Sequence, residues 1–320
     1  MEEIVAKIRR AEEEDFQKFP VVSYSRLDVL NQCLYRFYWQ YKKKLKSKKS
    51  AIALDVGTLV HSVLEDKGKT KINKTSYDYP ANISCAKQKV AEIQKKYFDE
   101  WIRPDNKSGM SYPQKFDVFF NEVLPTRMEE TDWEVIATEQ KFSYVWNERV
   151  IIQGFIDRVD KNTNSENMCL RVTDYKTSKA AYDESKLKTP LQMVVYALAC
   201  QLLYGTIPEK FEYDFVLVNE KREACSKGYL KRGITKLDKL LDCMFELEST
   251  GKYYPKPSPL CHWCSYCATN SAADLELQNI CKYYSEWTPE NKTFSTNKAF
   301  DKESFSVNEN TERTKRKLIF

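Results

Sequence analysis

The feature that most constrains the fold of this chain is a change in the spacing of its apolar residues near position 134. Three successive segments beyond this point are rich in β-branched and aromatic residues and are separated by polar turns: 134–146, 149–159 and 168–176. Before and after these segments, apolar residues recur at helical spacing. The pattern predicts an α/β fold with a central mixed sheet flanked by helices and the order α-β-β-β-α-β in its middle.

The segment before the sheet is expected to be helical. A charged, exposed helix is predicted over 2–18. Ser25 suits the cap of the next helix, which runs to about Tyr41 and contains Cys33. A further helix covers about 56–66, with one apolar face.

The segment after the three strands opens with a strong helix signal. Thr189 suits the N-cap, Pro190 the first helical position and Gln192 the return position of a capping box. Gly205 ends this helix. Three further elements, two strands and a helix, are expected beyond it: 211–219, 223–231 and 234–249.

Composition and pattern predict three regions. Residues 1–20 form the exposed N-terminal helix, 21–270 form the main domain with a helical insertion at 68–130, and 271–320 form a polar, mobile tail. The tail ends in basic residues followed by three apolar ones: Arg313, Lys315, Arg316, Lys317 and Leu318-Ile319-Phe320. Such an end suits a basic arm or a short peptide that docks on a partner such as a sliding clamp.

Several classes of protein are not expected. The chain has eight Gly, and the nearest approach to a phosphate-binding loop, Gly228 to Gly233, is followed by Ile234 and Thr235 where a Lys is needed. An ATP-driven motor within this chain is therefore not predicted. The sequence has no run of about 18 apolar residues, so no membrane span is predicted. The charged N-terminus resembles neither a secretion signal nor a transit peptide. We expect a reducing, cytoplasmic setting of a prokaryotic or phage-like kind, where clustered Cys bind metal more often than they pair.

The segment 168–176 ends in a carboxylate and an amine. Its alternation places Asp174 and Lys176 on one face, and the preceding strand ends with Asp157. If these strands pair as neighbours, Asp157 and Asp174 meet, and two carboxylates there need a cation such as Mg²⁺ or Mn²⁺. Lys176 beside the metal would position or deprotonate a water for phosphodiester hydrolysis. Taken alone, Asp-x-Lys also fits an ordinary surface strand end with an ion pair.

Five motifs follow one another in a defined order: Ser23-Tyr24-Ser25-Arg26-Leu27 with Cys33-Leu34-Tyr35-Arg36-Phe37, Gly57-Thr58-Leu59-Val60-His61, Gly154-Phe155-Ile156-Asp157-Arg158, Asp174-Tyr175-Lys176-Thr177, and Gln192 with Tyr196. Their types and order resemble the PD-(D/E)XK nuclease superfamily, in its RecB-like branch. The resemblance covers about residues 21–267. It implies a restriction-endonuclease-like core with an N-terminal helical part and a C-terminal cysteine knot.

The resemblance also implies roles for the strand residues. Asp157 and Asp174 would bind the catalytic metal ions, and the backbone carbonyl of Tyr175 would be a further ligand. Lys176 would be the catalytic lysine. Glu139 would be the upstream acidic residue of the branch.

Three helical residues have two interpretations each. By the resemblance, His61 would be a metal ligand or would organise the site, whereas an amphipathic helix alone would make it a core histidine. Gln192 and Tyr196 are four apart and share a helical face. They would contact DNA or support the site, or they would belong to the scaffold, with Gln192 completing its capping box.

A cysteine-rich segment ends the main domain. Cys261, Cys264 and Cys267 have the C-x₂-C-x₂-C spacing with which three thiolates bind one iron–sulfur cluster, while a fourth comes from elsewhere. Cys33 is the candidate fourth ligand. The layout resembles RecB-like nucleases of the AddB type and the CRISPR adaptation exonucleases. That resemblance implies a 4Fe-4S cluster that staples the two ends of the domain.

The last ligand of this group has an alternative. In the resembling proteins, five residues more often precede the final Cys, and this spacing leads to Asn270 here. Cys281 is a distant substitute for Cys267. A zinc ion is the main competitor of the cluster, because four thiolates also suit Zn²⁺.

Basic and aromatic residues occur together after Cys33. Arg36 lies among aromatic residues, and a lysine run follows: Lys42, Lys43, Lys44, Lys46, Lys48 and Lys49. Basic groups beside rings suit a single-stranded nucleic acid, whose phosphates contact Lys and whose bases stack on rings. The alternative is a solvated lysine loop after a core helix.

Together these features predict a Mg²⁺- or Mn²⁺-dependent DNA nuclease, and more specifically an exonuclease on single strands or DNA ends. Because no motor motif is present, a helicase or recombination partner would be a separate chain. The first alternative is a non-catalytic DNA-binding module of a repair or recombination complex with a structural zinc or iron–sulfur site. The presence of Asp157, Asp174 and Lys176 together argues against it. The second is an iron–sulfur redox protein, and the absence of a flavin or nucleotide motif argues against it.

Overall fold

The chain divides into two compact units. The computed structural model describes residues 6–45, 47, 51–226, 228–267, 274–278, 280–282, 285–288 and 293–296. One unit comprises Met1–Val21 and Ala51–Ile234 and contains the main sheet. The other comprises Val22–Ser50 and Thr235–Phe320 and contains the cysteine-rich segment.

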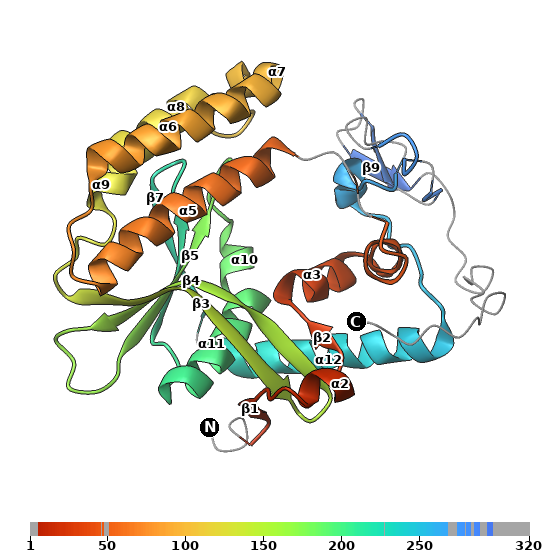
Figure 1. The fold of residues 1–320 in the computed structure, drawn as a ribbon. Helices are drawn as coiled ribbons and strands as arrows, with labels where there is room; N and C mark the ends of the chain where they lie inside the picture. Colours follow the sequence, from red (N-terminus) through yellow and green to blue (C-terminus); the bar gives the residue numbers. More distant parts are fainter. Residues whose placement is uncertain are drawn as a thin grey trace. The chain divides into compact units, whose positions relative to one another are not determined.

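A seven-stranded mixed sheet organises the first unit (Figure 1). Its strand order is β1-β3-β4-β5-β6-β7, and β2 pairs with β4 outside this path. β5 and β6 are parallel, whereas the pairs β1–β3, β3–β4, β4–β5 and β6–β7 are antiparallel. The strands are β1 (Ile8–Arg10), β2 (Val21–Val22), β3 (Trp133–Trp146), β4 (Val150–Asn162), β5 (Leu170–Lys176), β6 (Lys210–Phe215) and β7 (Glu220–Ala224). The predicted α/β fold with a central mixed sheet is confirmed.

The parallel step from β5 to β6 is made through helices. Parallel neighbours need a crossover connection, which α10 (Glu184–Leu187) and α11 (Leu191–Tyr204) provide. α11 ends as predicted at Gly205, whose φ of 73° lies in the left-handed region that glycine adopts without cost. Its beginning differs from the prediction, because Pro190 and not Thr189 is the N-cap and no side chain caps the helix.

A layer of helices forms the apolar core with one part of the sheet. Figure 1 shows α5 running across the sheet, with α6, α7, α8 and α9 grouped beyond it. The helical insertion predicted at 68–130 contains several helices, of which α6 and α7 are separate because the backbone at Tyr97 leaves helical geometry. The bounds are α5 (Ile52–Ile72), α6 (Tyr79–Lys96), α7 (Phe98–Ile102), α8 (Tyr112–Val118), the π-helical turn η2 (Phe119–Val123) and α9 (Leu124–Thr126).

Two local predictions in this unit are wrong. The described part of the segment predicted as a helix over 2–18 forms β1 and only a short helix, α2 (Asp15–Lys18). Pairing with β3 supplies β1 with backbone partners and buries Ile8, which outweighs local helix propensity. The strand predicted over 223–231 ends at Ala224, and α12 (Tyr229–Thr250) begins soon after a turn at Gly228 with φ of 74°.

The second unit begins with a helix that breaks at a cysteine. α3 (Tyr24–Gln32) is capped by Ser23, not Ser25, because Ser23 Oγ accepts a hydrogen bond from the backbone N–H of Arg26 at 3.3 Å. Cys33 was predicted inside this helix, but its backbone is extended and separates α3 from the following turns. The remaining elements are α4 (Leu34–Phe37), the π-helical turn η1 (Tyr38–Lys42), the 3₁₀ helix η3 (Pro259–Trp263), β8 (Ser285–Thr288) and β9 (Thr293–Thr296).

Two observations concern the chain as a whole. Within its described portion, no helix combines the length and the apolar character needed to cross a membrane. The basic end of the predicted tail, Arg313 to Phe320, lies outside the described residues, as do Lys46, Lys48 and Lys49 of the lysine run. In the described part of the predicted tail, β8 and β9 pair antiparallel.

Candidate active site

Three adjacent strands of the main sheet align one acidic residue each, in the middle of β3 and β4 and near the end of β5. In the β3–β4 register, Thr138 pairs with Arg158 and Gln140 with Ile156, so Glu139 and Asp157 between them fall opposite each other. The β4–β5 register, continued by one residue beyond Arg158, places Asp174 opposite Asp157. β4 and β5 are thus the neighbours that a meeting of the two aspartates requires.

Helix α5 adds a histidine to the two acidic residues of β3 and β4. His61 Nδ1 lies 3.6 Å from Oε1 of Glu139 and 3.7 Å from Oδ2 of Asp157. One ligand atom from each of the three residues lies within 4.8 Å of the others. Two carboxylate oxygens and an imidazole nitrogen form a donor set that suits Mn²⁺ or Mg²⁺. The residues present therefore fit a divalent metal ion.

The electrostatics of this group also favour a cation. Burial and the neighbouring charge of Asp174 raise the pKa of Asp157 to about 7. Burial alone would lower the pKa of His61, but the hydrogen bond to Glu139 and the charges of Asp157 and Asp174 raise it. The part of each shift that comes from neighbouring carboxylates reflects a local excess of negative charge, which a bound divalent ion would offset.

Asp174 is engaged by a different set of side chains. Its Oδ2 lies 2.5 Å from Lys176 Nζ, and its Oδ1 accepts hydrogen bonds from Gln192 Nε2 at 2.7 Å and Tyr196 hydroxyl at 3.2 Å. Lys176 also donates to Gln192 Oε1 at 3.1 Å. The structure thus brings the predicted Asp174, Lys176, Gln192 and Tyr196 together. Gln192 bonds to Asp174 and Lys176 and does not cap α11, and its role in the site stays a prediction.

The charge state of Lys176 follows from this arrangement. Burial alone would lower its pKa, but the adjacent carboxylate of Asp174 raises it above the ordinary value for lysine. The ammonium is therefore protonated at neutral pH, and it can hold a phosphate oxygen or a water but is not prepared to accept a proton.

Tyr175 joins the two halves of the site through its backbone. Its N–H donates to Oδ2 of Asp157 at 2.7 Å, and its carbonyl oxygen lies 3.2 Å from Nε2 of His61. The edge of one ring faces the other between His61 and Tyr175, with centroids 5.9 Å apart. The predicted carbonyl ligand therefore lies next to His61, one of the three candidate metal ligands.

A glycine supports the site from β4. A Cβ at Gly154 would lie 2.9 Å from Cζ of Phe142, so only glycine lets the phenyl ring lie over this strand. Phe142 in turn meets the ring of Tyr196, with centroids 6.1 Å apart. This explains why a glycine precedes Asp157 in the motif, a packing role that spacing alone does not reveal.

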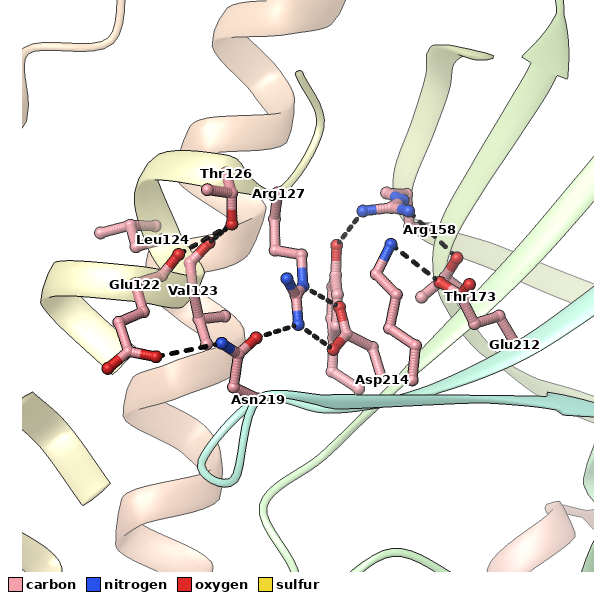
Figure 2. Close-up of polar contacts among 12 residues, drawn as sticks. Glu122, Val123, Leu124, Thr126, Arg127, Arg158, Thr173, Glu212, Asp214 and Asn219 are labelled. Carbon is pink, nitrogen blue, oxygen red and sulfur yellow. Dashed lines mark hydrogen bonds and ion pairs between the residues drawn. The ribbon is translucent and has the colours of Figure 1, made fainter. Parts of the chain in front are cut away.

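A buried ionic network that sequence reasoning missed lies beside the site (Figure 2). Arg127 donates to both carboxylate oxygens of Asp214, at 2.8 and 3.1 Å, and to Asn219 Oδ1 at 3.0 Å. Arg158, completely buried, donates to Thr173 Oγ1 at 3.2 Å. The only sequence signal for these contacts was the charged residues within otherwise apolar strands.

An open groove of about 480 Å³ adjoins the metal-binding group. His61 and Glu139 line it together with Leu54, Gly57, Thr58 and Ser62, mostly from α5. The glycine and histidine of the predicted G-x-x-x-H motif thus face one groove. A substrate in the groove would lie beside the candidate metal ligands.

The second unit gathers five cysteines around one cavity. The predicted ligands Cys33, Cys261, Cys264 and Cys267 line it, and so does Cys281. Cys281 comes close because its backbone forms a bridge with that of Cys267. Four thiolates suffice for a cluster or a zinc ion, so the residues present fit either group.

Backbone and side-chain hydrogen bonds tune these thiols. Cys33 Sγ accepts the N–H of Lys256, and Cys261 Sγ accepts that of Ser258, each at 3.4 Å. A hydrogen bond with Cys267 lowers the pKa of Cys264 to about 7, and burial opposes this shift. A thiol that ionises near neutral pH is prepared to bind a metal.

The residues predicted to contact DNA have several partners within the second unit. Lys42 forms an ion pair with Glu248, and Arg36 donates to Gln32 Oε1 at 3.0 Å. The ammonium of Lys43 lies 5.5 Å from the ring centroid of Tyr38, and Lys44 is exposed. Their proposed contacts with DNA stay a prediction.

Fold and site together define a restriction-endonuclease-like protein, in which acidic residues and a lysine of adjacent strands meet on a mixed sheet. The chain belongs to the PD-(D/E)XK nuclease superfamily, whose family model matches residues 21–271, and it falls in the RecB-like branch. The predicted family is thereby confirmed.

Curated relatives are bacterial proteins whose name describes one of the subunits of an ATP-dependent helicase/deoxyribonuclease. The protein from Clostridium perfringens is 25% identical over 195 residues, which are 54% of this chain and 16% of the relative. The protein from Exiguobacterium sibiricum is 25% identical over 227 residues, 65% of this chain and 19% of the relative. The chain thus spans less than a fifth of the length of these relatives.

Proposed function

We propose that this protein is a Mg²⁺- or Mn²⁺-dependent DNA nuclease and that it acts as an exonuclease on single strands or DNA ends. The convergence of His61, Glu139 and Asp157 next to the Asp174–Lys176 pair carries this proposal. It supports phosphodiester hydrolysis because a candidate metal ligand set and a fixed cation lie on adjacent strands of the sheet.

The site residues have separate tasks in this proposal. His61, Glu139 and Asp157, with the carbonyl of Tyr175, would hold the metal ion. When bound, the metal would lower the pKa of a coordinated water and offset charge on a phosphate oxygen. Lys176, held protonated by Asp174, would orient the attacking water or the phosphate. Water adds to phosphorus and gives up a proton, the P–O bond to the leaving oxygen breaks, and that oxygen takes up a proton, so each cleavage consumes one water.

The relatives support DNA as the substrate and a motor as a separate partner. Their name combines a helicase with a deoxyribonuclease, and the present sequence has no phosphate-binding loop with its lysine. We propose that a helicase or recombination chain delivers the strand. The candidate residues for contacting this strand are Arg36, Lys42, Lys43 and Lys44.

A cleavage assay tests the proposed function. Single strands labelled at the 5′ or the 3′ end are incubated with Mg²⁺ or Mn²⁺ and with wild-type, Asp174→Ala or Lys176→Ala protein. We expect the wild type to shorten one labelled end progressively and both variants to lose almost all of this activity. A wild type that cuts nothing, or variants that match it, would overturn the proposal. Binding without cleavage would favour the non-catalytic DNA-binding module.

We propose further that the cavity of the second unit holds a 4Fe-4S cluster that staples Cys33 to the cysteine-rich segment. Cys261 and Cys264 would be two more ligands, and Cys267 or Cys281 the last. Metal analysis and a visible spectrum after anaerobic purification test this assignment. If the analysis finds zinc and the spectrum shows no visible absorbance, the cavity is a zinc site and not a cluster site. Single Ser variants of Cys267 and Cys281 then identify the ligand, because only its loss removes the metal.

A further inference from the structure

Tyr175 is placed to set the geometry of the candidate metal site. Its N–H holds Oδ2 of Asp157 at 2.7 Å, and its carbonyl oxygen lies 3.2 Å from Nε2 of His61. These two groups belong to the peptide units on either side of the Tyr175 Cα, so a displacement of Tyr175 within β5 would change both contacts. Whatever fixes the Tyr175 side chain therefore also affects the metal ligands.

Arg158 holds the other end of that side chain. The residue follows Asp157 directly on β4 and is completely buried. Its guanidinium donates to the hydroxyl of Tyr175 at 3.1 Å, to Thr173 Oγ1 at 3.2 Å and to Asp160 Oδ2 at 3.1 Å. The planar fork of an arginine can make these bonds simultaneously, whereas a lysine or an apolar side chain cannot.

Burying an arginine is costly unless its donors are satisfied, and a well-packed apolar residue is often as stable at such a position. Stability alone therefore does not explain Arg158. We propose that Arg158 is a positioning residue of the nuclease site, which sets the affinity for the divalent metal by fixing Tyr175. This inference rests on the proposed function, because it assigns Arg158 to the same metal site.

Arg171 provides a matched comparison within the same network. It is also buried, and it donates to Asp160 Oδ2 at 2.9 Å and to Glu130 Oε2 at 2.5 Å. Its guanidinium lies 4.7 Å from the ring centroid of Trp133. These contacts do not involve Tyr175, so the loss of Arg171 disturbs the network without releasing that side chain.

The test measures metal binding apart from cleavage. Mn²⁺ binding is followed by calorimetry without DNA, and the Mn²⁺ concentration for half-maximal cleavage is measured separately. The proteins are wild type, Arg158→Met, Arg158→Lys, Tyr175→Phe, the double variant Arg158→Met/Tyr175→Phe, and Arg171→Met. Tyr175→Phe removes a single hydroxyl, so it still tests the contact if Arg158→Met does not fold.

We expect Arg158→Met to weaken Mn²⁺ binding roughly 10- to 100-fold, as loss of partners behind metal ligands generally does. Tyr175→Phe should weaken binding in the same direction, and the double variant should show less than the product of the two effects, because both break one contact. Excess Mn²⁺ should restore the cleavage rate of Arg158→Met. Arg171→Met should bind Mn²⁺ like the wild type.

The contrary outcomes are distinct. Wild-type affinity in both Arg158→Met and Tyr175→Phe, or an equal loss in Arg171→Met, would overturn the role of Arg158 while cleavage by the wild type still supports the nuclease. A wild type that neither binds Mn²⁺ nor cleaves DNA would overturn the proposed function, and the role of Arg158 with it.

Discussion

At the scale of single residues, Gln192 is where local rules and tertiary contacts compete most directly. Its position after Thr189 and Pro190 satisfies the pattern of a capping box, yet its side chain bonds to Asp174 and Lys176. A hydrogen bond to a charged group contributes about 1.5–3 kcal/mol, whereas an N-cap contributes about 1 kcal/mol. The charged partners therefore decide the conformation of Gln192.

We predict that Gln192→Ala lowers the cleavage rate roughly 10- to 100-fold, because the groups that orient Lys176 and Asp174 are lost. Gln201, which lies on the same helix, is the matched control, and Gln201→Ala should cleave at the wild-type rate. Single-turnover kinetics at saturating metal measures both. Equal cleavage rates for Gln192→Ala and the wild type would show that Gln192 has a structural role only.

At the scale of secondary structure, α5 is the element that connects the site to the sheet. It carries His61, and it approaches β3 so closely that a Cβ at Gly68 would lie 2.1 Å from Thr138 Cγ2. At Gly57 in the same helix, a Cβ would lie 3.5 Å from Thr177 Oγ1, which is an ordinary contact. Two glycines of one helix thus have different reasons to be there.

We predict opposite effects of alanine at these two positions. Gly57→Ala should raise the free energy of unfolding by about 0.5–1 kcal/mol, since alanine favours the helix. Gly68→Ala should lower it, because forced overpacking costs about 1–3 kcal/mol and exceeds that gain. Urea denaturation of both variants measures the difference. A Gly68→Ala protein as stable as Gly57→Ala would contradict the close approach of α5 to β3.

Elements are also joined by Glu130, which contacts Arg171 on β5 and Lys221 on β7. Burial alone would raise its pKa, but the hydrogen bonds from Arg171 and Lys221 lower it to about 2. A carboxyl with a lowered pKa stabilises the fold above its unfolded pKa, and this contribution disappears as pH falls through its folded value.

We therefore predict that Glu130→Gln is less stable than the wild type at neutral pH and that the difference shrinks between about pH 4.5 and pH 2. Denaturation series at several pH values measure it. Glu134→Gln is the control, because Glu134 is exposed on β3. If the stability difference between Glu130→Gln and the wild type grows as the pH falls, the prediction for this ion pair is contradicted.

At the scale of the molecule, two distant parts of the sequence build the second unit. Val22–Ser50 and Thr235–Phe320 form it, and Cys33 meets the thiols of the cysteine-rich segment in one cavity. Loop closure over such a distance is entropically costly, so a metal group that ties the two segments would stabilise the unit considerably.

We predict that Cys33→Ser accelerates tryptic cleavage at Lys42, Lys43 and Lys44, because the segment would lose the attachment that the proposed metal group provides. Cys243→Ser, whose thiol lies outside the cavity, should be cut at the wild-type rate. Timed proteolysis with mass spectrometry measures both rates. Equal cleavage of the two variants would show that the cluster does not hold this segment.

The order of the central helices and strands was predictable because apolar periodicity is a local property, and the strands at 133–176 and the end of α11 at Gly205 agree with it. The site was predictable in part, because Asp174, Lys176 and His61 lie in motifs with defined spacing. Glu139 has no such spacing, yet it lies opposite Asp157 once β3 and β4 pair. The resemblance in a few motifs thus identified candidate residues, but it did not show which of them contact one another.

The sequence by itself determined the class of fold, the strands that carry the site, and the residues whose chemistry suits a metal and a phosphate. Only the tertiary structure decided that residues 8–10 join the sheet, that Gln192 bonds to charged partners, that Cys281 reaches the cysteine cavity, and that Arg158 lies behind Tyr175. The physical reason is the same in each case. These contacts join residues far apart in the chain or on different strands, and their energies exceed the local preferences that a sequence displays.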